Sequence, residues 1–227
     1  QIDHIAGRLQ QVAERLFTRE AMLAGITCDE SGYASFASGF THLAGELPSA
    51  RLHRHEWVFD VSPANEGLRS AAQVQYVVQG YDFKKMGYRW DGRMRVLSQI
   101  LSRDYLQNRV RVIGGAYGGF TGFSPSGMVF FASYRDPNLK ETLDNYAGTP
   151  EFLRDFEADD QAMTRFIIGT IAGMDRPLTP SQKGNLAIQR YLEKTTHEEL
   201  LRERQAVLST TAADIRAMEP MVSAILG

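Results

Sequence analysis

The sequence predicts an α+β protein in which helices pack on a mainly antiparallel sheet. Apolar residues recur at helical spacing near both ends of the chain, whereas two runs of strand character flank one long helical pattern between residues 73 and 134. With 227 residues, of which 43% are hydrophobic, the chain can bury a substantial core. We therefore expect a globular protein with separate helical and sheet segments.

The first sixty residues predict helix, strand and helix. Residues 33–46 form a helical pattern that ends at Pro48, and the apolar run 21–28, which includes Cys28, predicts a short buried strand. Residues 57–59 could form another strand. The helix expected over residues 2–17 has one apolar face, made of Ile5, Leu9, Val12, Ala13 and Leu16.

The middle of the chain predicts strands on either side of a long helix. Residues 73–79 alternate apolar residues with glutamine, which predicts a half-buried strand with Val74, Tyr76 and Val78 on its buried side. After a glycine-rich stretch, residues 128–134 predict a further strand that ends at Arg135-Asp136-Pro137-Asn138. The apolar stripe of the long helix consists of Trp90, Met94, Leu97, Leu101 and Tyr105.

Helices dominate from residue 139 onward. Thr179 and Thr196 each begin a capping box, and Thr211 is expected to cap a last helix that runs beyond residue 220. An earlier helix has a stripe made of Met163, Phe166, Ile167, Thr170, Ile171 and Met174.

The sequence shows no internal repeat and no convincing linker. We expect residues 1–20 to be a terminal helix that belongs to a preceding domain, and residues 21–227 to form one domain, leaving open whether that domain lacks its last strand. The chain begins at Gln1, directly on a helical pattern, so we expect it to be part of a longer polypeptide.

Composition disfavours several classes of function. The 25 basic and 27 acidic residues give a net charge of −2, so no strong field favours nucleic acid or anionic lipid. No apolar run approaches the ~20 residues that span a bilayer. We therefore expect neither a nucleic-acid nor a membrane partner. A single cysteine can form neither an internal disulfide nor a thiolate metal site.

Zinc, nucleophile and phosphate motifs are missing from the sequence. No histidine lies in H-E-x-x-H or H-x-x-E-H, and neither a G-x-S-x-G elbow nor a P-loop occurs. His53 and His55 could share one face of an extended segment, but Arg51 and Arg54 would repel a cation, which favours a solvated edge over a metal site. The histidines are His4, His42, His53, His55 and His197.

The segment from Arg111 to Tyr117 has a possible chemistry of its own. Arginine supplies a fork of donors and tyrosine a hydroxyl, while Gly114, Gly115 and Ala116 would let a peptide backbone approach. A glycine-bent strand here could receive a peptide by edge addition. Alternatively, Arg111 makes a surface ion pair and Tyr117 packs on the core, which composition alone favours.

These residues resemble a known family. Residues 105–119, YLQNRVRVIGGAYGG, followed by residues 131–138, FASYRDPN, are similar to the C-terminal half of presequence proteases and their bacterial relatives in the pitrilysin/insulinase clan. The resemblance covers roughly residues 60–216. Supporting matches are residues 65–67, 73–79, 183–184 and 209–215.

This resemblance implies a metalloprotease-like α/β roll and a zinc-dependent endopeptidase that degrades oligopeptides. In the family, the N-terminal half binds zinc through H-x-x-E-H and a distal glutamate and supplies the general base. The C-terminal half contributes an arginine and a tyrosine, matched here by Arg111 and Tyr117, that bind the substrate backbone and the oxyanion. Gly114, Gly115 and Ala116 would lie along the bound peptide.

The same resemblance implies that the partners are an unstructured peptide and the N-terminal half of the same polypeptide. This chain alone is then expected to bind no zinc and to be inactive. The location would be cytoplasmic in a bacterium, and the mitochondrial matrix or a plastid in a eukaryote. Two alternatives remain: a non-catalytic scaffold of the same fold, and a peptide-binding module that works by strand addition.

Overall fold

The computed structural model describes residues 2–51, 55–59 and 65–226 of the chain. They form two compact units. Unit 1 comprises residues 1–67 and 178–194, and unit 2 comprises residues 68–177 and 195–227. Within the described residues, no helix combines the length and the apolar character that crossing a bilayer requires.

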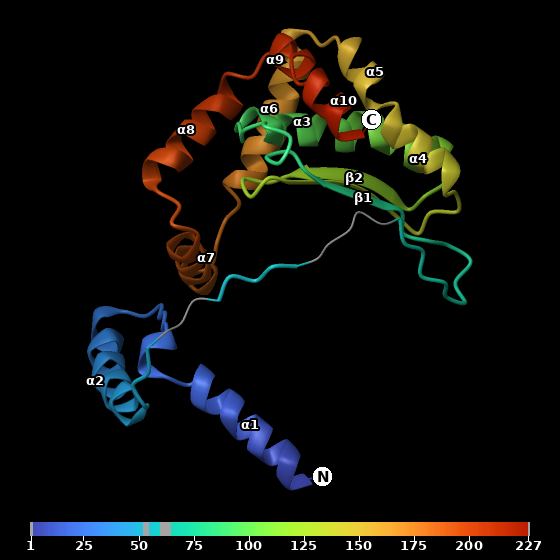
Figure 1. Ribbon diagram of the computed structural model, residues 1–227. Helices are drawn as coiled ribbons and strands as arrows, with labels where there is room; N and C mark the ends of the chain where they lie inside the picture. The colour runs from blue at the N-terminus through green and yellow to red at the C-terminus, as the bar shows by residue number, and fades with distance from the viewer. Residues whose placement is uncertain (1, 52–54, 60–64, 227) are drawn as a thin grey trace. The chain divides into compact units, whose positions relative to one another are not determined.

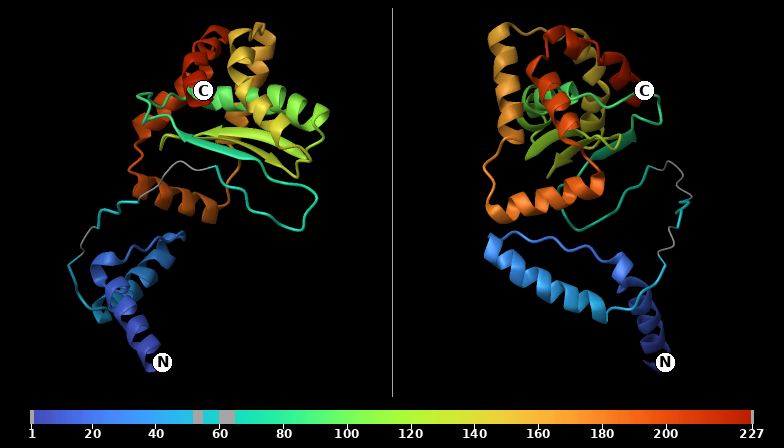
Figure 2. Two further views of the ribbon diagram at one scale, coloured as in Figure 1. Left: turned by 45° about the vertical axis from the view of Figure 1, so that its right-hand side comes forward. Right: turned by 90° about the vertical axis from the view of Figure 1, so that its left-hand side faces the viewer.

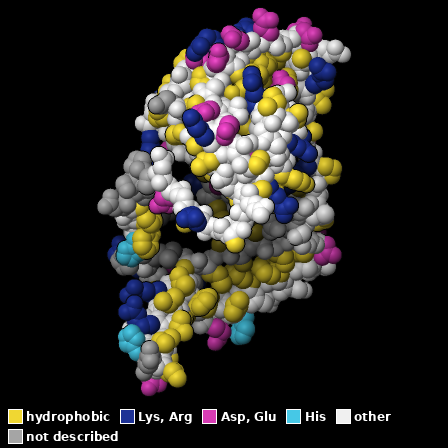
Figure 3. All heavy atoms as spheres, turned by 90° about the vertical axis from the view of Figure 1, so that its right-hand side faces the viewer, with side chains coloured by type: hydrophobic (Ala, Val, Ile, Leu, Met, Phe, Trp, Pro, Cys, Tyr) yellow, Lys and Arg dark blue, Asp and Glu magenta, His cyan; other side chains and the backbone are white. Residues whose placement is uncertain are grey.

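The regular elements described in unit 1 are all helices. It contains α1 (Ile2–Leu16), the short 3-10 helix η1 (Arg19–Ala21), α2 (Glu30–Glu46) and α7 (Pro180–Glu193) (Figure 1). The two helices predicted near the N-terminus are confirmed. No side chain of α1 is buried, and its apolar face is exposed. Hydrophobic side chains gather on the lower body in Figure 3, which contains α1 and α2.

The strands predicted in unit 1 are wrong. Residues 22–29 are extended but unpaired, and Cys28 is exposed. This segment packs on helix α7 instead of on a sheet. The side chain of Ile188 in α7 fills the space beside Gly25, and the side chain of Thr27 fills the space beside Gly184 in α7. The described residues 55–59 are neither helix nor strand.

Unit 2 contains a three-stranded antiparallel sheet with strand order β1-β3-β2. Its strands are β1 (Val78–Asp82), β2 (Gly118–Phe123) and β3 (Met128–Tyr134). Phe130 in the central strand lies opposite Gly80 of β1 and Gly122 of β2. The bounds of β3 are those predicted from the sequence.

A long helical segment covers one face of this sheet (Figures 1 and 2). Helix α3 (Arg93–Ile100) continues into η2 (Leu101–Ile113), a π-helix of 13 residues. Four of the five residues of the predicted stripe, from Met94 to Tyr105, are buried in the core of unit 2, so the predicted helix is confirmed. The residues with no exposed surface here include Val96, Leu97, Ile100, Leu101, Leu106, Val110, Val129 and Phe131.

The strand predicted over residues 73–79 has the wrong bounds and the wrong buried face. Regular pairing begins only at Val78, and the buried residue is Val77, whereas Tyr76 and Val78 are each 62% exposed. Successive side chains alternate between the two faces of a sheet, so a prediction that places one residue on the wrong face places every residue of the strand on the wrong face. Val77 is fixed inward because its carbonyl accepts the amide of Ser133 and the hydroxyl of Tyr146.

The remaining helices of unit 2 lie beyond the sheet in the sequence. They are α4 (Lys140–Ala147), α5 (Thr149–Arg154), α6 (Asp160–Met174), α8 (His197–Leu208), α9 (Ala212–Arg216) and α10 (Glu219–Leu226). Thr179 and Thr196 cap helices with capping boxes, and Thr211 caps a helix, as predicted. The capping box at Thr211 was not predicted. The prediction of a single last helix is wrong, because α9 and α10 are separate helices. In one continuous helix, the ring of Pro220 would clash with the carbonyl of Arg216.

The contact between α3 and the sheet can be tested by core truncation. Leu97→Ala should lower the free energy of unfolding of unit 2 by about 2–5 kcal/mol, because Leu97 has no exposed surface. Leu201→Ala on α8, where the side chain is 52% exposed, should change it by less than about 0.5 kcal/mol. Urea unfolding in a Trp57→Phe background would leave Trp90 as the fluorescent reporter of unit 2. Equal effects of the two substitutions would contradict this packing.

Candidate functional site

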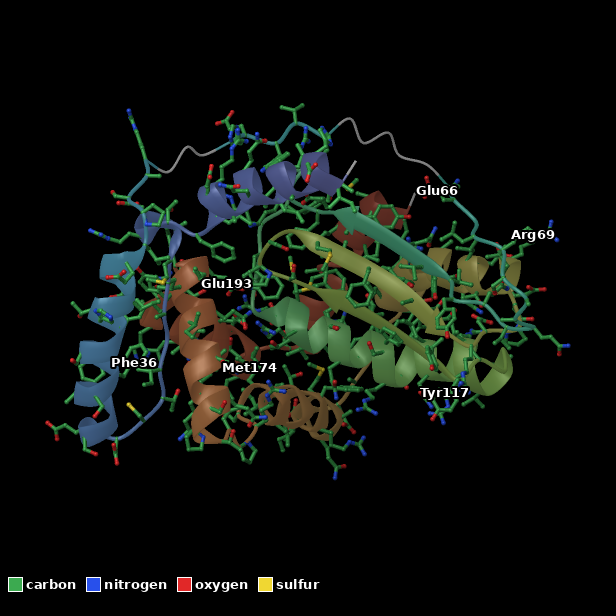
Figure 4. All side chains as sticks on the ribbon, turned by 90° about the horizontal axis from the view of Figure 1, so that it is seen from below. Phe36, Glu66, Arg69, Tyr117, Met174 and Glu193 are labelled. Carbon is green, nitrogen blue, oxygen red and sulfur yellow. The ribbon has the colours of Figure 1, made fainter. Side chains whose placement is uncertain are left out.

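Arg111 and Tyr117 lie on either side of a tight turn in unit 2. Arg111 is in the last turn of η2, and Tyr117 directly precedes β2. The prediction that residues 111–117 form a glycine-bent strand is wrong, because the helix continues to Ile113. Figure 4 looks onto the sheet from the side opposite α3 and shows Tyr117 at the end of the sheet.

The turn uses its own amide groups to end the helix. The Gly114 amide donates to the carbonyl of Arg109 at 3.1 Å, the Gly115 amide to Arg111 at 3.0 Å, and the Ala116 amide to Val110 at 3.1 Å. Gly115 has φ +78°, which a residue with a side chain adopts only at a cost. Residues 114–116 therefore cannot offer these amides to a peptide.

The turn brings the Arg111 and Tyr117 side chains together. The guanidinium carbon of Arg111 lies 5.9 Å from the centre of the Tyr117 ring, within the range of a cation–π contact. The Tyr117 ring meets Tyr134 edge to face at 5.6 Å, and its amide donates to the Tyr134 carbonyl at 3.0 Å. Tyr117 is 66% exposed, so it does not pack in the core.

The charge of Arg111 is not neutralised within the described part of the chain. No carboxylate oxygen there lies within 4.0 Å of the Arg111 guanidinium. The surface ion pair considered as the alternative for Arg111 is therefore not seen among these residues. An exposed guanidinium and an exposed phenol side by side provide several hydrogen-bond donors for an oxygen ligand.

The segment after β3 braces this turn, and sequence reasoning missed its role. The Asn138 side-chain amide donates to the Gly114 carbonyl at 2.5 Å, and Pro137 lies against Gly115. Asn138 is itself held by Asp136, whose carboxylate is fully buried. This carboxylate accepts a hydrogen bond from the backbone amide of Asn138 at 2.8 Å and one from the Thr142 hydroxyl at 2.7 Å. The Asp-Pro-Asn sequence signals a turn, but not what that turn supports.

Strand addition at β2 is blocked at the middle of that edge strand. The Thr121 amide donates to the Ser102 hydroxyl at 3.0 Å, and the Ser98 hydroxyl donates to the Thr121 carbonyl at 2.7 Å. The helix therefore already occupies the backbone groups that an added strand would need. β1 forms the opposite edge of the sheet. Because hydrogen-bonded and non-hydrogen-bonded residue pairs alternate along an antiparallel ladder, the backbone amide and carbonyl groups of Val78 and Gly80 point away from β3.

A concavity of about 610 Å³ lies on the helix side of unit 2 and does not include the pair. Burial raises the pKa of Tyr105 in its wall, and the Tyr105 hydroxyl donates to the Asn145 carbonyl at 2.7 Å. Arg111 and Tyr117 thus lie on an open surface outside this concavity. The remaining lining residues include Asp104, Asn108, Arg109, Asp144, Glu151, Phe152 and Asp155.

The residues that the structure describes include no group of three or more His, Cys, Asp and Glu side chains that could hold a metal ion. His55 is described and exposed, whereas His53 and Arg54 lie outside the described residues. The donor set of this chain, as far as it is described, does not fit a zinc site. That the chain binds no zinc remains a prediction.

Residues 65–224 match the family model described as the PreP C-terminal domain. The chain belongs to this family. The predicted resemblance to the C-terminal region of presequence-protease-like peptidases is thereby confirmed. The match includes both Arg111 and Tyr117 and the bracing segment after β3, although it assigns no role to any of them.

Curated relatives of this PreP C-terminal domain extend the match to almost the whole chain. Protein HypA of Clostridium perfringens is 37% identical over 98% of this chain and 23% of its own length. Presequence protease 1, chloroplastic/mitochondrial, of Arabidopsis thaliana is 37% identical over 93% of this chain and 20% of its own length. The chain thus spans about a fifth of the length of these relatives.

A solved structure supports the fold of the PreP C-terminal domain. A protease from Helicobacter pylori superposes with a TM-score of 0.54 at 16% identity, over 81% of this chain and 49% of that one. The predicted α+β fold, with helices on an antiparallel sheet, is therefore confirmed.

The turn between Arg111 and Tyr117 can be tested at its left-handed residue. Gly115→Ala should lower the free energy of unfolding by about 1–2 kcal/mol, because alanine at φ +78° is strained. Gly118→Ala is the matched control: its added methyl group meets no atom within 4 Å, so its effect should be small. Urea unfolding followed by Trp90 fluorescence checks both. Equal stability of the two variants would contradict the turn geometry.

Proposed function

We propose that this chain is the substrate-binding C-terminal portion of a zinc-dependent endopeptidase that degrades oligopeptides. Arg111 and Tyr117 bind the peptide backbone near the scissile bond and stabilise the oxyanion. The observation that supports this most directly is the pairing of the two exposed side chains at 5.9 Å in a member of the PreP C-terminal domain family. The peptidase activity named for the relatives supports the reaction class.

The chemistry of the two side chains suits this role. Attack on a peptide carbonyl turns a neutral oxygen into an oxyanion, and donors that are already in place stabilise that charge without reorganising. Arginine stays protonated at any working pH, and a tyrosine hydroxyl donates near neutral pH. The helix end and the Asn138 brace hold the turn that connects them.

The metal belongs to another part of the parent protein in this proposal. The donor set described in this chain does not fit zinc, so the N-terminal half of the same polypeptide supplies zinc and the general base. The chain contributes substrate contacts only and is inactive alone. Its partners are an unstructured peptide, which can reach an open surface, and that N-terminal half.

The proposal also covers domain boundaries and location. In this proposal, residues 1–20 form the end of the preceding domain. Residues 21–227 form the C-terminal domain. Relatives are named as mitochondrial or chloroplastic proteins, and the proposed location here is the cytoplasm of a bacterium, or the mitochondrial matrix or a plastid of a eukaryote.

Removing single donors tests the role of the pair. In the full-length protein, Tyr117→Phe and Arg111→Gln should each lower kcat on peptide substrates by about 10²–10³-fold, because a transition-state donor is lost. Tyr117→Phe keeps the ring that contacts Tyr134, so folding should be unaffected. Tyr33→Phe, at an exposed tyrosine of α2, is the control and should cleave normally. Wild-type turnover of both test variants would contradict the proposed role of the pair.

Metal analysis tests the division of labour. The purified 227-residue chain should contain no stoichiometric zinc and cleave no peptide, whereas the full-length protein should contain zinc and lose activity with a chelator. Elemental analysis and a fluorogenic peptide assay provide the two measurements. Stoichiometric zinc in the isolated chain would place a metal site in the part we consider metal-free.

A further inference from the structure

A second arginine–tyrosine pair adjoins the first. Tyr134 ends β3 and Arg135 follows it, and the Arg135 guanidinium carbon lies 5.7 Å from the centre of the Tyr134 ring. Tyr134 in turn meets Tyr117 edge to face at 5.6 Å. Arg111, Tyr117, Tyr134 and Arg135 therefore form one continuous row of side chains, which we call the arginine–tyrosine row.

The inner members of this row are held firmly. Tyr134 contacts Tyr117 on one side and Tyr76 on the other, where the ring centres are 5.2 Å apart at 74°. Edge-to-face contacts of this kind favour a defined ring orientation. The row is thus attached to the segment before β1 through Tyr76 and to the start of β2 through Tyr117.

The outer member, Arg135, has an unusual backbone. Its φ is +48°, a left-handed conformation that costs a residue with a Cβ about 1–2 kcal/mol. The pairing of β3 before it and the buried Asp136 after it impose this conformation. Strain of this sort persists where the surrounding structure fixes it and often accompanies function. Here the left-handed conformation fixes the direction in which the Arg135 side chain projects from the backbone.

The guanidinium of Arg135 is available to a ligand. Arg135 is exposed, and in the described ranges no carboxylate oxygen lies within 4.0 Å of it. The three contacts along the row limit the separation of its two guanidinium groups to roughly 17 Å, about five residues of extended peptide. A peptide that reaches Arg111 can therefore also reach Arg135.

We propose that Arg135 is a specificity-determining residue that binds an acidic side chain of the peptide within about five residues of the scissile bond. This inference rests on the proposed function of Arg111 and Tyr117. An arginine fork matches a carboxylate in a bidentate fashion, whereas lysine offers only a point charge. Tyr134 positions Arg135 by lying beneath its guanidinium group. Arg111 and Tyr117 then bind the substrate backbone at one end of the row, and Arg135 binds an acidic side chain at the other end.

A scan of peptide substrates tests this in the full-length protein. Each peptide carries one glutamate at a different position, has both ends blocked so that no other carboxylate is present, and is compared with its glutamine counterpart. The wild-type protein should prefer glutamate about three- to tenfold in kcat/KM at one or two positions, mainly through KM. Raising the salt concentration should weaken the preference.

Variants of Arg135 assign that preference. Arg135→Gln should abolish it while changing kcat/KM on the glutamine peptides by less than about twofold, and Arg135→Lys should retain part of it. Arg135→Gly also removes the charge but relieves the left-handed strain, so it should lose the preference without losing stability. This variant separates selectivity from folding.

Several outcomes would overturn the inference. They are a wild-type protein with no glutamate preference at any position, a preference that survives Arg135→Gln, or an equal loss of kcat on glutamate and glutamine peptides. Arg111→Gln and Tyr117→Phe should lower kcat on both peptide types alike. If they do not, while Arg135→Gln still removes the preference, the proposed role of the first pair fails and that of Arg135 stands.

Discussion

The site depends on the buried carboxylate of Asp136. A carboxylate with no exposed surface is costly unless its oxygens are hydrogen-bonded, and here the Asn138 amide and the Thr142 hydroxyl supply those bonds. The backbone of Asp136 also exchanges two hydrogen bonds with Gln75. One residue thereby joins the strand before it, the approach to β1 and helix α4, and through Asn138 it supports the turn at Gly114.

The placement of helices explains why the site is open. Helices α3 and η2 cover one face of the sheet, so alternate strand residues such as Val129 and Phe131 are fully buried. The opposite face carries Tyr76, Phe120 and Met128, which are all exposed. The arginine–tyrosine row lies at one end of the sheet. All four of its members are exposed to solvent.

Local signals were enough to predict part of this fold. The helix caps, the bounds of β3 and the stripe from Met94 to Tyr105 depend on neighbours within a few residues, and all were predicted. One error, the single last helix, overlooked the local signal of Pro220. The others arose where distant residues decide. Residues 21–28 lie on α7 instead of in a sheet, and the parity of β1 depends on partners more than fifty residues away. The sequence shows that Arg111 and Tyr117 are six residues apart, but it did not predict that they lie on opposite sides of a turn between a helix and a strand.

The commitment of every amide from Gly114 to Ala116 has an evolutionary consequence. Enzymes that hold an oxyanion with main-chain amides keep those donors whatever residue occupies the position. Here those amides end a helix, so in the proposed function the oxyanion donors of this segment are side chains, and one nucleotide change can remove either donor while leaving the fold intact. A lineage could therefore abandon catalysis quickly and retain the scaffold, or restore it by simple reversion.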